Sequence, residues 1–230
     1  MFKKFNLILV STLLLTFNVY SQKGTYGNIS FEKATNISGK QRMLSQRIAK
    51  LFLLKKAGAN GAELDQEYNS SLRLFARNLS ILEANGKNAS AKVQLSIKSE
   101  KTQWKYFDKT LHNKTAPSVK LVMEMSNDLL KKAHALVLAI EEESKFTKDL
   151  KNGISTKFNQ NLKVETVNIS GKQRMLSQRL CLYYTACRLF RKEKKDAKGL
   201  CKEVENIYGE MNASLTVSYT HLTLPTIYSV

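Results

Sequence analysis

Two arginines in identical surroundings are the residues of this sequence best suited to bind a ligand. Asn36–Arg47 and Asn168–Arg179 both read NISGKQRMLSQR, so Arg42 and Arg174 occupy the same position of a repeated motif. An arginine offers a planar fork of N–H donors that matches a small planar or tetrahedral anion. The repeat therefore predicts an anion-binding function for these two arginines.

The helical phase of the motif places each arginine among small and polar residues. With Arg42 as origin and ~100° per residue, the opposite side carries the apolar residues Ile37, Leu44, Ile48 and Leu51, which we expect to pack into a bundle. Arg42 shares its own side with Ser45 and Ala49, and the second copy repeats this with Ser177 and Cys181. The candidate ligand-binding residues are Arg42, Arg174, Gly39, Gly171, Ser38, Ser170, Gln46 and Gln178.

A glycine in each copy indicates that something approaches this face closely. Glycine inside a helix costs about 1 kcal/mol relative to alanine, which favours a close contact with another helix or a ligand. If the two copies, or two chains, pair through this face, Arg42 and Arg174 converge on one site. A bound anion would relieve their repulsion and couple binding to helix packing. The alternative is that both are surface arginines beside a face where a helix docks.

The elements that position the motif are helices throughout. Apolar residues recur with helical spacing, and breaks occur at Gly58–Gly61, 84–88, 112–115 and 152–153. The first helix begins near Phe31, and the fourth runs from a first turn that contains Pro117 to about residue 150. Four helices joined by short loops predict an all-α, up-and-down four-helix bundle. The second copy supplies two more helices, over about 157–191 and 197–215, and is incomplete.

The two ends of the sequence differ from the helical part. Residues 1–21 have a basic start, a short apolar run and a small final residue, which predicts a secretory signal peptide. Residues 217–230 resemble a translated sequencing adapter fused to a truncated reading frame, and we interpret them as a scar. The predicted domains are therefore the first bundle at 22–150 and a truncated second copy at 151–216.

Charge and cysteine content exclude several classes of function. The formal net charge of +18 suits nucleic acid, but the predicted export and the scattered lysines favour small anions or an acidic envelope surface. Cys187 and Cys201 flank a predicted helix–helix turn, where they either form a disulfide or are two unrelated buried residues. His112 and His134 lack metal-ligand spacing, and no catalytic set is present. We therefore expect no metal, no cofactor and no enzyme.

The repeated segment resembles the signature of the PilJ-type N-terminal sensory domain, which is related to the periplasmic domain of NarX-type nitrate and nitrite sensor kinases. This resemblance implies an exported, dimeric four-helix bundle with the motif on its first helix. It further implies that Arg42 and Arg174 contact the anion, with Gly39 and Gly171 lining the gap. The nitrate sensors have a tyrosine where this chain has Gln46 and Gln178.

These observations together predict a periplasmic sensory module for a small, nitrate-like or nitrite-like anion, in a signal-transduction or chemotaxis-type system. The alternative is a helical interaction or dimerisation module without a small ligand. We expect a homodimer or intrachain pairing of the two copies, no nucleic acid, and a membrane-bound signalling partner. The expected location is the periplasm of a bacterium of the Gram-negative type, in association with the inner membrane or free of it.

Overall fold

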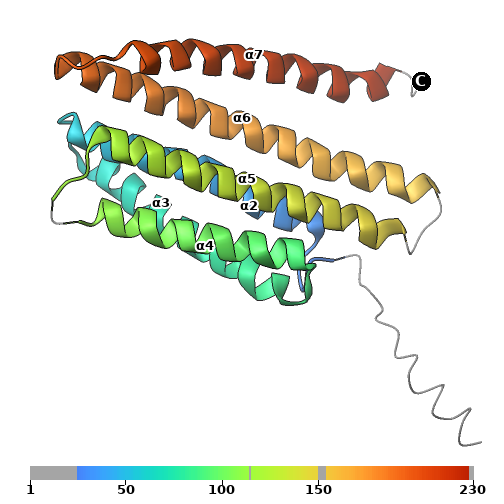
Figure 1. Cartoon of the computed structure of the whole chain (residues 1–230). Helices are drawn as coiled ribbons and strands as arrows, with labels where there is room; N and C mark the ends of the chain where they lie inside the picture. Colours follow the sequence, from blue (N-terminus) through green and yellow to red (C-terminus); the bar gives the residue numbers. More distant parts are fainter. Residues whose placement is uncertain (1–24, 114, 150–153, 228–230) are drawn as a thin grey trace, which may run out of the picture.

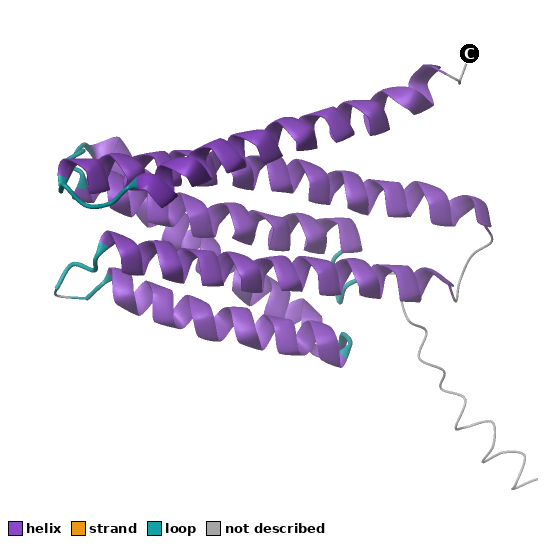
Figure 2. Cartoon of the chain, turned by 45° about the horizontal axis from the view of Figure 1, so that its top comes forward, coloured by secondary structure: helices purple, strands orange, loops and turns teal. Residues whose placement is uncertain are grey.

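The computed structural model describes residues 25–113, 115–149 and 154–227, and its regular elements are helical (Figure 2). The only β-type backbone pairing among these residues is an isolated bridge between Tyr26 and Ile29. The helices are α2 (Phe31–Lys56), α3 (Ala62–Asn85), the short 3₁₀ helix η1 (Gly86–Asn88), α4 (Ala91–Leu111), α5 (Val119–Asp149), α6 (Ile154–Lys192) and α7 (Lys198–Ile227). The all-α prediction is confirmed.

Helices α2 to α5 form an up-and-down bundle, with α2 packed against α3 and α5, and α4 packed against α5 (Figure 1). Ser30 and Ser90 are the N-cap residues of α2 and α4, because each hydroxyl accepts a hydrogen bond from the backbone N–H three residues later. The apolar stripe predicted for the motif is buried as expected; its members are Ile37, Leu44, Ile48 and Leu51.

The second motif lies beside the first, within the same chain. Helix α6 packs along the length of α2 and runs in the same direction, and α7 returns along α6 (Figure 1). A Cβ atom added to Gly171 would lie 3.9 Å from the Cα of Gly39, so the two motifs are also in register. The two copies thus pair side by side, and α2 is enclosed by α3, α5 and α6.

The helix boundaries follow the sequence closely, with two differences. Pro117 precedes α5 and does not lie in its first turn; the Ser118 hydroxyl accepts from the Leu121 N–H there. Helix α7 continues to Ile227, past the predicted end at residue 215. With no strand to pair with, this segment satisfies its backbone N–H and C=O groups within a helix. Reading 217–230 as a scar stays a prediction.

The amino-terminal signal predicted for residues 1–21 lies outside the described residues. Among the described helices, none combines the length and apolar character needed to span a bilayer.

A disulfide closes the α6–α7 hairpin. Cys187 and Cys201 are bonded, with their Cα atoms 5.3 Å apart and a sequence separation of 14. The sequence left open whether these two cysteines form a disulfide or are unrelated buried residues, and the structure contains the disulfide. Cys181 is the remaining cysteine; it is free and exposed.

We expect this disulfide to stabilise the α6–α7 hairpin by about 3 kcal/mol, because it removes loop-closure entropy from the unfolded chain. Thermal unfolding, followed by circular dichroism with and without a reductant, measures the effect. A Cys181→Ser background prevents thiol exchange. An unchanged melting temperature after complete reduction would contradict the expectation.

Candidate anion site between the two motif helices

The glycines of the two motifs allow α2 and α6 to approach closely around one arginine. A Cβ atom added to Gly171 would lie 3.2 Å from Nη2 of Arg42, and one added to Gly39 would lie 3.6 Å from the same atom. A side chain at Gly171 would therefore be tight against the Arg42 guanidinium, whereas a Cβ at Gly39 would meet it at an ordinary van der Waals distance. This is the close approach that the paired glycines predicted.

Arg42 is almost completely buried and reaches across to the second motif. Its side chain is 2% exposed. Nη2 donates to the backbone carbonyl of Asn168 at 3.1 Å and to its side-chain Oδ1 at 2.6 Å. Nη1 lies 3.3 Å from Nδ1 of His134 on α5. The arginine therefore joins three helices, and its hydrogen-bond partners among the described residues are amide and imidazole groups.

Within the described part of the chain, the Arg42 guanidinium forms no ion pair with a carboxylate. Its Nε is buried and makes no hydrogen bond. The pKa of Arg42 is lowered to about 10, chiefly by burial; Glu141 partly offsets this effect, and Arg174 adds to it. The group stays charged at neutral pH, and a buried charge without a partner is costly.

A cavity of about 500 Å³ opens beside this guanidinium, between α5, α6 and α7. Arg42 contributes to its wall together with Asn127, Leu130, Lys131, His134, Asn168, Ile169, Lys172, Met175, Leu176, Arg179, Glu203 and Glu210. Most of these charges are already paired: Lys172 with Glu210 at 2.9 Å, and Arg179 with Glu203 at 3.2 Å. Lys131 lies 3.2 Å from Asp128. Arg42 is the cation of this cavity for which the described residues provide no acidic partner.

Arg174 mirrors Arg42 but lies in a different environment. Its Nη2 donates to Oδ1 of Asn36 at 3.4 Å, so each arginine binds the first residue of the opposite motif. The arginine face of α2 is buried, at Ser38, Arg42, Ser45 and Ala49, whereas the equivalent residues of α6 are exposed, at Ser170, Arg174, Ser177 and Cys181. Arg174 does not line the cavity, so its role as an anion ligand stays a prediction.

The other predicted site residues bind their own helices or neighbouring ones. The hydroxyl of Ser38 donates to Thr35, and that of Ser170 donates to Val167, each to a backbone carbonyl. Gln46 is fully buried, donates to the Ser126 carbonyl at 3.1 Å and accepts from Arg179 at 3.5 Å. None of these three side chains lines the cavity.

Gln178 differs from its counterpart Gln46. It is partly exposed, and its Oε1 is buried and accepts no hydrogen bond from another residue. The structure therefore gives the two motif glutamines different surroundings, as it does the two arginines.

His134, Asn168 and Arg179 line the cavity but were not among the predicted site residues. Asn168 and Arg179 are the two ends of the second motif, so the repeat itself carried a signal for them. His134 had none, because it lies on α5, 92 residues from Arg42 in sequence. Arg179 also donates to Asn127 at 2.7 Å and lies over the ring of Tyr183.

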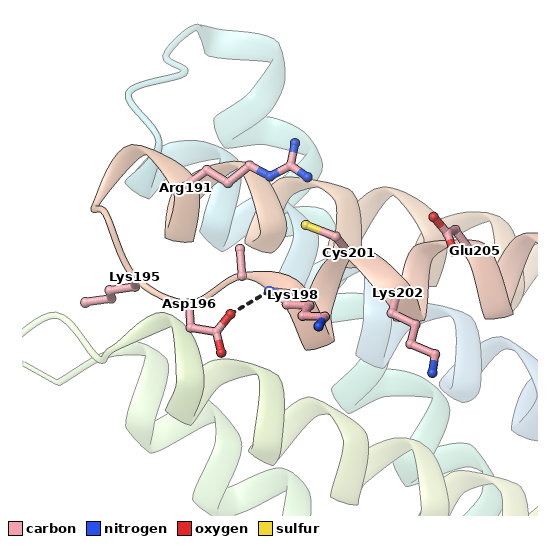
Figure 3. Close-up of a pocket in the computed structure, with 8 residues that line it drawn as sticks. Arg191, Lys195, Asp196, Lys198, Cys201, Lys202 and Glu205 are labelled. Carbon is pink, nitrogen blue, oxygen red and sulfur yellow. Dashed lines mark hydrogen bonds between the residues drawn. The ribbon is translucent and has the colours of Figure 1, made fainter.

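A second, basic cavity of about 610 Å³ lies at the α6–α7 turn. Figure 3 shows Arg191, Lys195 and Lys202 pointing in different directions from its wall. Asp196 accepts a hydrogen bond from the backbone N–H of Lys198 at 2.9 Å, at the start of α7. Because diverging side chains cannot contact one small ligand together, this cavity is a weaker candidate than the one at Arg42.

We expect Gly171→Leu to lower the free energy of unfolding by about 1–3 kcal/mol, because carbons beyond Cβ enter the space of Arg42 and α2. Gly209→Leu is the matched control, since a Cβ at Gly209 in α7 meets nothing within 4 Å. Urea denaturation of both variants measures the difference. Equal stabilities would show that α2 and α6 are not in close contact at the motif.

The comparisons with known proteins agree with this fold. Residues 31–136 match the family model described as type IV pili methyl-accepting chemotaxis transducer N-term, PilJ. Searches of curated proteins and of solved structures gave no match. The matched region begins at the first residue of α2, includes the first motif with Arg42, and ends within α5. Residues 31–136 of this chain are therefore similar to the PilJ N-terminal domain.

Proposed function

We propose that this chain is a sensory module that binds a small inorganic oxyanion at Arg42. The observation that carries the proposal is a buried guanidinium at the wall of a cavity, held between two identical motifs, for which the described residues provide no ion-paired carboxylate. A buried charge is costly unless it is paired. A monovalent or divalent oxyanion supplies both the missing charge and acceptors for the N–H groups.

Several features of the site support a small ligand over a large one. The cavity holds about 500 Å³, and its other cations already have carboxylate partners. One additional negative charge therefore neutralises Arg42 without disturbing the pairs around it. Nitrate and nitrite are the first candidates, and the glutamines at positions 46 and 178 are where selectivity is expected to differ from the nitrate sensors.

The position of Arg42 suggests how binding becomes a signal. Its hydrogen bonds link α2, α5 and α6, and an anion that recruits the guanidinium competes with the bonds to Asn168. Occupancy would then shift the packing of α6 against α2, which is the coupling that a sensor requires. In this proposal the module works in the periplasm, alongside a membrane-bound signalling partner of the chemotaxis-transducer type.

Thermal unfolding in a panel of anions tests the proposal. At fixed ionic strength, with chloride as reference, we expect at least one of nitrate, nitrite, sulfate and phosphate to raise the melting temperature in a saturable manner. Stabilisation by mass action follows if the anion binds only the folded state. If the melting temperature in all four anions matches that in chloride, the anion proposal is wrong.

Self-association without a small ligand is a second candidate function, favoured by the open face of α6. Beside this face lies a groove of about 730 Å³, lined by Tyr184 and Tyr208, each 55% exposed. A second copy of this chain is the occupant we would test. Light scattering over a concentration series supports it if the chain dimerises and Tyr184→Ser with Tyr208→Ser restores the monomer.

A further inference from the structure

The contact between Arg42 and His134 fixes which nitrogen of the histidine carries a hydrogen. Arginine has only donors, so Nη1 of Arg42 donates to Nδ1 of His134 across their 3.3 Å separation. Nδ1 must then be the unprotonated nitrogen. In a neutral imidazole the hydrogen therefore resides on Nε2, which becomes a donor.

His134 is placed to bring that donor to the anion. It lines the same cavity as Arg42, and the residue is exposed, so it lies at the solvent-facing side of a site whose inner wall is the buried arginine. An anion seated between the two residues replaces the direct Arg42–His134 contact with one hydrogen bond to each. Both partners then donate to it.

We propose that His134 is a second anion-contacting residue and that its protonation strengthens binding, which makes the affinity of the site depend on pH. This inference rests on the proposed function. Protonation turns Nδ1 into a donor, so the hydrogen bond from Arg42 is lost and two cations face each other. An anion between them accepts from both and relieves their repulsion.

The charges around His134 are consistent with this arrangement. Arg42 contacts it from α2. The other charged groups that line the same cavity are Lys172 and Arg179 of α6, Glu203 and Glu210 of α7, and Lys131 of its own helix. Burial, Arg42 and Lys172 lower the pKa of His134 below its usual value. The free protein therefore holds His134 neutral at pH 7, and a bound anion, by adding negative charge, favours the protonated form.

Calorimetric titration of the intact chain with nitrate at pH 7.5 and pH 5.5 tests the inference; sulfate replaces nitrate if the anion panel shows that it binds better. We expect the dissociation constant to fall by about tenfold at the lower pH, because binding and proton uptake are linked. Repeating the titration in buffers of different ionisation enthalpy should reveal proton uptake on binding.

Two variants separate His134 from other titrating groups. His134→Gln should bind with an affinity that is flat between the two pH values, and His112→Gln should behave as wild type, because His112 contacts Asp108 on its own helix. Binding that is equally tight at both pH values in wild type overturns the role of His134 and leaves the anion site standing. Absence of binding at both pH values overturns the inference together with the proposed function.

Discussion

Arg42→Gln is expected to weaken anion binding about 100-fold, which corresponds to roughly 3 kcal/mol, the scale of the lost charge-assisted hydrogen bonds. Glutamine keeps a polar side chain of moderate length but removes the charge for which the described part of the chain offers no carboxylate. Calorimetry with the anion that stabilises the wild type measures this loss. Circular dichroism verifies that the variant remains helical.

Arg174→Gln provides the matched control, since it is the same substitution at the repeat-related position. Arg174 is exposed and lies outside the cavity, but its charge acts on Arg42. We expect the dissociation constant for the anion to rise only a few-fold in this variant. Equal losses in the two variants would show that the arginines act as a symmetric pair, as the sequence suggested. Equal retention of affinity would remove Arg42 from the site.

Glu100 is expected to make the stability of the bundle fall as pH rises through the neutral range. It is fully buried on α4, and neither carboxyl oxygen accepts a hydrogen bond from another residue. Burial raises the pKa of Glu100 from 4.5 to about 8. The folded state therefore keeps the proton that the unfolded chain releases above pH 4.5. Stability is highest below that pH, decreases by roughly 4 kcal/mol towards pH 8, and is level beyond it.

Glu100→Gln should remove this dependence, because the amide resembles the protonated carboxyl in shape and cannot ionise. We expect the variant to exceed the wild type in free energy of unfolding at pH 8 and to match it near pH 4.5. Urea titrations at several pH values give both curves. Glu124→Gln, at an exposed residue of α5, is the control that should follow the wild type. Parallel curves for Glu100→Gln and wild type would contradict the expectation.

Most of the fold could be predicted from the sequence because local signals were strong. Glycines and polar clusters end each helix, and the apolar stripe with Leu44 and Ile48 is buried as its period required. The sequence predicted that the motif face pairs either between the two copies of one chain or between two chains, and the structure has the first arrangement. The predicted end of α7 at residue 215 was wrong, since the residues after it carry no local signal that continues the preceding helix.

The candidate site was only partly predictable, for a physical reason. Two identical segments received different surroundings, because α5 covers Arg42 while the arginine face of α6 is open among the described residues. Identity in sequence therefore did not translate into equal burial. His134 meets Arg42 through the packing of α5 on α2, a contact that no spacing within the motif specifies.

The most direct test of the account is nuclear magnetic resonance of the Arg42 Nε–H group during anion titration. This group is buried and without a hydrogen-bond partner, so its signal should be distinct, and loss of one peak in Arg42→Gln assigns it. The account predicts a saturable shift of this signal with the same anion that raises the melting temperature. If that anion saturates the protein while the Arg42 signal stays in place, the anion binds elsewhere and the central claim is wrong.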